Sequence, residues 1–129
     1  MNPDHAVDIY SNYVTGEITF IRRRDDSLYL LHSAADRKEI GAAASEAIEP
    51  KISGGLPWSK IPEDWFVEWD QLDVVVAWRD GGQLVIATPF CHWGKAPDIL
   101  INNQPSHLDF GTAIVQQINY AKSKREKGA

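Results

Sequence analysis

Apolar positions in the first quarter of the chain alternate with polar ones over short runs, which is the spacing of β-strands. Residues 7–14 (VDIYSNYV), 18–22 (ITFIR) and 28–32 (LYLLH) form three such runs. The links between them, residues 15–17 and 23–27, are short and rich in glycine or charged residues. Short links favour antiparallel neighbours, so this part of the chain predicts a three-stranded meander.

The pattern changes to a helical period over residues 33–49, an alanine-rich stretch of high helix propensity. Ser33 is the expected N-cap, with Asp36 in the first turn, where a carboxylate suits the helix dipole. Pro50 is expected to end the helix, and the small Gly41 to let it lie close against a sheet. One helical face collects the apolar residues expected in the core: Ile40, Ala43, Ala44, Ala47 and Ile48.

A second group of strands follows a loop. Residues 50–62 hold three prolines and two glycines and predict that loop. Residues 73–79 and 83–90 predict a hairpin across Asp80-Gly81-Gly82, and its valine-rich first strand is expected inside the sheet. Residues 99–101 predict an edge strand.

The last periodic stretch, residues 109–122, predicts a second helix with Ser106 or Asp109 as its N-cap. Residues 123–129 are expected to form a flexible, solvated tail, and residues 1–6 are expected to be flexible because they carry no periodic signal. The inward face of this helix is expected to hold Phe110, Ala113, Ile114, Gln117, Ile118 and Ala121.

Together these elements give the order βββαβββα within one domain, residues 1–129. Hairpin-linked strands with two helices predict an α+β fold. We expect an antiparallel sheet of about five or six strands with the helices on one face.

Charge is uneven along the chain, although the net charge is only −5. Residues 25–121 hold fourteen acidic and six basic residues, a local balance of −8. Such a body repels nucleic acid phosphate and attracts a basic protein, although modest acidity also simply aids solubility. Bases gather at Arg22, Arg23 and Arg24, expected to be a solvated turn, and after residue 121.

The single cysteine excludes an intrachain disulfide and fits a reducing compartment. No apolar run reaches the roughly 18 residues of a membrane span. The first residues lack the basic and apolar regions of a signal peptide. The expected location is the cytoplasm, and neither nucleic acid nor a membrane is an expected partner.

Motifs for catalysis, metal binding or a cofactor do not emerge from the sequence. Cys91 and His92 are adjacent, but neighbouring residues at a strand end point in opposite directions and pair poorly as nucleophile and base. The four histidines lack the spacing of a metal site, and the glycine pairs lack that of a phosphate-binding loop. We therefore expect no metal, no cofactor and no enzyme activity.

Residues 58–73 (WSKIPEDWFVEWDQLD) combine three of the five tryptophans and one phenylalanine with five carboxylates and one lysine. Aromatic anchors among acids suit a surface that grips a basic protein. Pro62 is placed to open a short helix in which Trp65 and Trp69 are neighbours. The same aromatics also suit the core, with the carboxylates as a solvated side. The residues expected to contact a partner are Trp58, Glu63, Asp64, Glu68, Trp69 and Asp70.

Residues 27–49 (SLYLLHSAADRKEIGAAASEAIE) and 74–90 (VVVAWRDGGQLVIATPF) resemble bacterial immunity proteins of contact-dependent growth inhibition systems. The shared pattern is a strand, a polar link, and a glycine followed by an alanine-rich helix. The resemblance covers roughly half the chain and carries over no functional residue. It implies a protein that binds one cognate toxin domain, often a basic nuclease, and blocks its active site without catalysis or a cofactor.

Two other functions stay open. A pocket formed by residues 50–62, the Trp58–Asp73 segment, Cys91 and His92 would make the chain a small enzyme or ligand-binding domain. As a subunit or adaptor of a larger assembly, the chain would differ from an inhibitor mainly in the identity of its partner.

Overall fold

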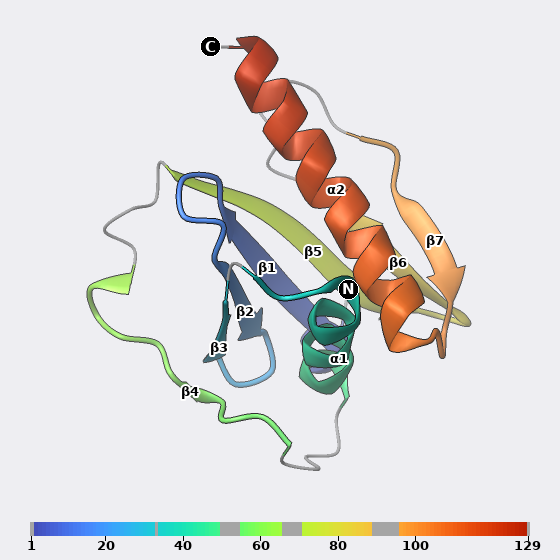
Figure 1. Cartoon of the computed structure of the whole chain (residues 1–129). Coiled ribbons are helices and arrows are strands. Elements are labelled where there is room, and N and C mark those ends of the chain that lie inside the picture. Colours follow the sequence, from blue (N-terminus) through green and yellow to red (C-terminus); the bar gives the residue numbers. More distant parts are fainter. Residues whose placement is uncertain (1, 33, 50–54, 66–70, 89–95, 129) are drawn as a thin grey trace.

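The part of the chain that the structure describes folds into one seven-stranded antiparallel sheet and two α-helices (Figure 1). The computed structural model describes residues 2–32, 34–49, 55–65, 71–88 and 96–128. The predicted α+β class is confirmed, but the sheet has seven strands where about five or six were expected. The additional strand is a two-residue element inside the stretch predicted to be a loop.

The elements follow the predicted order, with this short strand inserted after the first helix. In chain order they are the 3-10 helix η1 (Pro3–His5), β1 (Ala6–Asn12), β2 (Ile18–Arg22), β3 (Ser27–Leu31), α1 (Arg37–Ile48), β4 (Ser59–Lys60), β5 (Leu72–Asp80), β6 (Gln83–Ala87), β7 (Ile99–Asn102) and α2 (His107–Gly128).

The strands lie in the order β4-β3-β2-β1-β5-β6-β7, and every neighbouring pair runs antiparallel. As predicted, β5 lies inside the sheet and β7 forms one edge. The β5–β6 hairpin turns at Gly81 and Gly82, with Asp80 opposite Gln83. Gly81 has a φ of 62°, which glycine adopts at little steric cost, so the predicted turn chemistry is confirmed.

Both helices pack on the same face of the sheet (Figure 1). In α1 the Asp36 carboxylate accepts a hydrogen bond from the Glu39 backbone N–H, and the Glu39 carboxylate accepts one from that of Asp36. This capping box makes Asp36 the N-cap, so the prediction of Ser33 is wrong. The predicted core face is confirmed, because its five residues are at most 3% exposed: Ile40, Ala43, Ala44, Ala47 and Ile48.

The two helices cross with their backbones in direct contact at a pair of glycines. A Cβ atom on Gly41 would lie 1.7 Å from the carbonyl oxygen of His107, and one on Gly111 would lie 1.6 Å from that of Arg37. Real Cβ atoms essentially never approach other atoms below 3.0 Å, so neither position accommodates a side chain. The expectation that Gly41 faces a sheet is therefore wrong, because it faces α2.

Helix α2 continues to Gly128, beyond Lys122, where the pattern placed its end. The Ser106 hydroxyl caps it by accepting a hydrogen bond from the Asp109 backbone N–H at 3.1 Å. Near the other end, Arg125 donates to both carboxylate oxygens of Asp73 on β5, with a shortest distance of 2.7 Å. Residues 123–128, which were expected to belong to a solvated tail, therefore continue the helix, and the ion pair of Arg125 with Asp73 holds the helix against the sheet.

The three consecutive arginines do not form a solvated turn, contrary to the expectation. Each is engaged by its own partners: Asp25, Ser27 and the Trp58 ring for Arg22, Asp8 for Arg23, and the carbonyl oxygens of Ala47 and Glu49 for Arg24. Arg24 thereby places a cation at the C-terminal end of α1, where it complements the helix dipole. The cluster holds the β2–β3 turn against α1 and β1.

Candidate functional site

The side chain of Trp58, at the start of the segment 58–73, contacts Glu46, Arg22 and Tyr29. Its indole N–H donates a hydrogen bond to Glu46 on α1 at 3.1 Å. The Arg22 guanidinium carbon lies 4.4 Å from the indole ring centroid, and the centroid of the Tyr29 ring lies 5.6 Å away. The half-buried Trp58 ring therefore fastens the loop before β4 to α1 and β3. Contact between Trp58 and a partner stays a prediction.

Charged groups beside Trp58 neutralise one another. Burial lowers the pKa of Arg22, and the nearby charges of Asp25 and Glu46 partly offset this effect. Burial would raise the pKa of Asp25, but hydrogen bonds from Ser27 and the charge of Arg22 outweigh it, so the pKa is lowered overall. Arg22 and Asp25 form an ion pair at 3.0 Å. These groups organise the turn and offer no poised acid or base.

Glu63 and Asp64 are exposed in the turn that follows β4, and their contact with a partner stays a prediction. The turn is closed by a hydrogen bond from the Trp65 backbone N–H to the Pro62 carbonyl at 3.1 Å. Residues 66–70, with the rest of the predicted short helix, lie outside the described residues. They include the other three predicted contact residues: Glu68, Trp69 and Asp70.

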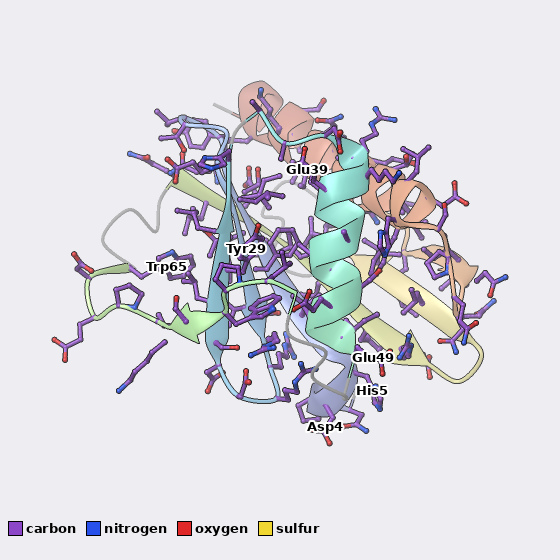
Figure 2. All side chains as sticks on the ribbon, turned by 60° about the horizontal axis from the view of Figure 1, so that its bottom comes forward. Asp4, His5, Tyr29, Glu39, Glu49 and Trp65 are labelled. Carbon is purple, nitrogen blue, oxygen red and sulfur yellow. The ribbon has the colours of Figure 1, made fainter. Side chains whose placement is uncertain are left out.

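The Trp65 side chain packs edge to face against Tyr10, with ring centroids 4.9 Å apart and an interplanar angle of 75°. Tyr10 follows Ile9 along β1, and Ile9 belongs to the core under the helices, so Tyr10 points to the opposite face of the sheet. In Figure 2, Tyr29 points toward α1, whereas Trp65 lies on the other side of the strands. Burial raises the pKa of Tyr10, as does the charge of Asp8, so its phenol is neutral at physiological pH.

An exposed leucine lies in the same row of the sheet. Tyr10 pairs with Thr19, and Thr19 pairs with Leu30 on β3. Leu30 is 52% exposed, and two strand spacings place its backbone about 10 Å from that of Tyr10. We call the group formed by Tyr10, Leu30, Glu63, Asp64 and Trp65 the Trp65 surface. It combines aromatic and aliphatic groups on the sheet face that neither helix covers with the acidic groups of the turn that leads into Trp65.

The sequence reasoning missed Tyr10 and Leu30 as members of this surface. A signal was present, because residues 28–31 (LYLL) are apolar on both sides of the strand. Leu31 is buried under the helices, so the alternation leaves Leu28 and Leu30 for the other face. Only the register with β2 and β1 places Leu30 in the row of Tyr10.

A hollow of about 370 Å³ lies beside α1, where Ser45, Glu46, Glu49 and His107 supply its polar lining. Glu46 accepts hydrogen bonds from Trp58 and from the Leu56 backbone N–H, and Glu49 lies 3.7 Å from Arg79. Both carboxylates therefore have cationic or hydrogen-bonding partners within the protein. The predicted alternative pocket involves two residues that lie outside the described part of the chain: Cys91 and His92.

Comparison with family models, with curated proteins and with solved structures finds no match. Within the described residues, histidine, cysteine and carboxylate side chains nowhere gather in threes as ligands for a metal ion. In the same part of the chain, neither helix combines the length and the apolar composition that crossing a bilayer requires.

Proposed function

We propose that this chain is an inhibitor of a basic protein, namely an immunity protein that neutralises a cognate toxin domain of a contact-dependent growth inhibition system. The proposal is carried by the Trp65 surface. It joins an aromatic pair and an exposed leucine, on the helix-free face of the sheet, to two exposed carboxylates in the turn that leads into Trp65. Such an inhibitor acts in the bacterial cytoplasm and needs neither catalysis nor a cofactor.

The chemistry of a nuclease supports this proposal. A nuclease must present cationic groups to phosphate, and carboxylates occupy such groups through charge-assisted hydrogen bonds. Trp65 and Leu30 would supply the desolvated centre of the interface, since a few apolar and aromatic anchors carry most binding energy. The excess of acids over residues 25–121 would accelerate the encounter with a basic partner.

The first test is complex formation with the toxin domain encoded by the adjacent reading frame. Mixing the two purified proteins is expected to give a stoichiometric complex in size-exclusion chromatography and to abolish the toxin's activity. If the adjacent frame encodes no toxin and affinity purification from the native bacterium yields no basic partner, the proposal is wrong.

The second test places the contact on the Trp65 surface. We expect the double variant Glu63→Lys/Asp64→Lys to associate with the toxin domain about tenfold more slowly or worse. Its thermal unfolding should be nearly unchanged, because exposed substitutions usually alter stability by less than about 0.5 kcal/mol.

A matched variant distinguishes the effect of direct contact on the association rate from the effect of net charge. Asp4→Lys/Asp80→Lys makes the same change in net charge at two exposed positions, in η1 and at the β5–β6 turn. This control is expected to slow association less than the Glu63/Asp64 variant. Equal slowing by both variants would show that only the overall field matters and that the Trp65 surface is not the contact.

A further inference from the structure

Strand β7 forms an edge of the sheet that is apolar and carries no protective charge. Among the described residues it pairs only with β6, and its sequence is Ile-Leu-Ile-Asn. Natural edge strands usually carry lysine, proline or a bulge, which discourage pairing with another chain. β7 has no charged residue or proline within it, so its outer backbone groups are suited to pairing with an added strand.

A groove of about 500 Å³ runs beside this edge, between β7 and the N-terminal half of α2. Figure 1 shows β7 flanking that half of the helix. Ile99 and Ile101 line the groove on the strand side, whereas Leu100 points to the other face and is 56% exposed. The helix side is formed by residues at positions i, i+3, i+4 and i+7, which share one helical face: Asp109, Thr112, Ala113 and Gln116.

These two features occur together in proteins that bind peptides by strand addition. The backbone of the peptide pairs with the free edge, and alternate side chains enter the groove beside it. We propose that β7 binds an extended, basic peptide segment of another protein as an eighth strand. The basic side chains of that segment would lie in the groove, with their aliphatic stems against Ile99, Ile101 and Ala113 and their charges near Asp109. The intervening apolar side chains would lie on the other face, beside Leu100.

The charge of the residues that line the groove favours a basic peptide. Asp109 is exposed and, among the described residues that line the groove, is the one that carries a charge. The remaining polar lining consists of hydroxyl and amide groups, such as Thr112 and Gln116, which hydrogen-bond without imposing a charge. A lysine or arginine of the peptide would therefore find a carboxylate and no competing cation. This inference concerns the edge remote from β4 and does not rest on the proposed function.

The test uses the full chain and capped peptides of about eight residues that alternate valine with lysine, glutamine or glutamate. Amide chemical shifts of the labelled protein are followed by NMR during titration. We expect the lysine peptide to bind most tightly, with shift changes confined to residues 99–102 and 109–116. Absence of changes in these residues with every peptide overturns the proposal, and so does a preference for the glutamate peptide.

Backbone pairing is tested with the lysine peptide N-methylated at alternate residues along one edge. The two possible N-methylation patterns leave opposite edges free, so one pattern is expected to bind and the other to lose binding at least tenfold. Equal binding of both patterns would show that the groove holds side chains without strand addition.

Variants of the protein give a second, independent readout. Gln116→Trp should fill the groove and weaken binding at least tenfold, whereas Asn119→Trp, at an exposed position of α2 that does not line the groove, should not. Asp109→Asn should reduce the preference for lysine over glutamine peptides about two- to fivefold, the range of an exposed ion pair. Equal effects of the two tryptophan variants, or an unchanged preference in Asp109→Asn, contradict the assignment.

Discussion

The contact between α1 and α2 gives the sharpest prediction about stability, because each helix leaves no space for one methyl group on the other. Gly41→Ala would bring a Cβ atom 1.7 Å from the His107 carbonyl oxygen, and Gly111→Ala would bring one 1.6 Å from that of Arg37. Both obstacles are backbone atoms, so no side-chain rotation relieves the clash. The helices must move apart or shift along each other.

The size of the effect follows from the size of that movement. Raising the Gly41 contact from 1.7 Å to the 3.0 Å limit requires a separation of roughly 1.3 Å. Overpacking of this kind costs about 1–3 kcal/mol and occasionally more. Because both obstacles are backbone atoms, the cost lies at the upper end of that range, about 3 kcal/mol. The higher helix propensity of alanine offsets about 1 kcal/mol of this cost. We therefore expect the free energy of unfolding of each variant to fall by about 2 kcal/mol, which lowers Tm by about 6–10 °C in a chain of this size.

Thermal unfolding followed by circular dichroism measures this loss. Gly82→Ala is the matched control, because a Cβ atom there meets nothing within 4 Å and the residue has no left-handed backbone conformation. Its Tm is expected to stay close to that of the wild type. If Gly41→Ala and Gly111→Ala are as stable as Gly82→Ala, the close crossing of the helices is refuted.

Three further predictions concern polar groups. Asp73→Asn removes the carboxylate that Arg125 binds at 2.7 Å, and we expect it to lower the free energy of unfolding by about 1–3 kcal/mol. Urea unfolding measures this change, and an unchanged midpoint would contradict the prediction. Gln117→Leu leaves two carbonyls without the amide donor, those of Ile86 and Pro97, and should cost about 1–3 kcal/mol in the same assay. Because the pKa of Tyr10 is raised above 10.0, its stabilising contribution is complete below pH 10 and disappears as the pH rises through the raised value. An absorbance titration of wild type and Tyr10→Phe should therefore differ by one late-titrating phenol, and equal profiles would disprove the shift.

The sequence by itself determined the class of fold and the order of its main elements. Residues 18–22 were predicted as a strand and form β2, and the predicted core face of α1 is buried. The hairpin at Gly81 and Gly82 also agrees. These features are readable because they depend on local preferences, namely side-chain periodicity and the backbone freedom of glycine.

Local preferences could not fix what depends on contacts between distant parts of the chain. The short β4 exists because Ser59 and Lys60 pair with β3, and Gly41 matters because α2 crosses α1 there. Neither contact leaves a periodic pattern. The helix cap is a further case, since both Ser33 and Asp36 suit the role and the reciprocal bonds with Glu39 favour Asp36.

The candidate site divides in the same way. Composition alone singled out residues 58–73, and it indicated that Glu63 and Asp64 are exposed. Only the tertiary structure showed Trp58 held by Glu46 and Arg22. Only the strand register brought Leu30 into the row of Tyr10, the residue that packs against Trp65. A residue's chemistry sets what it can contact, but the packing of distant strands and helices decides which contacts are made.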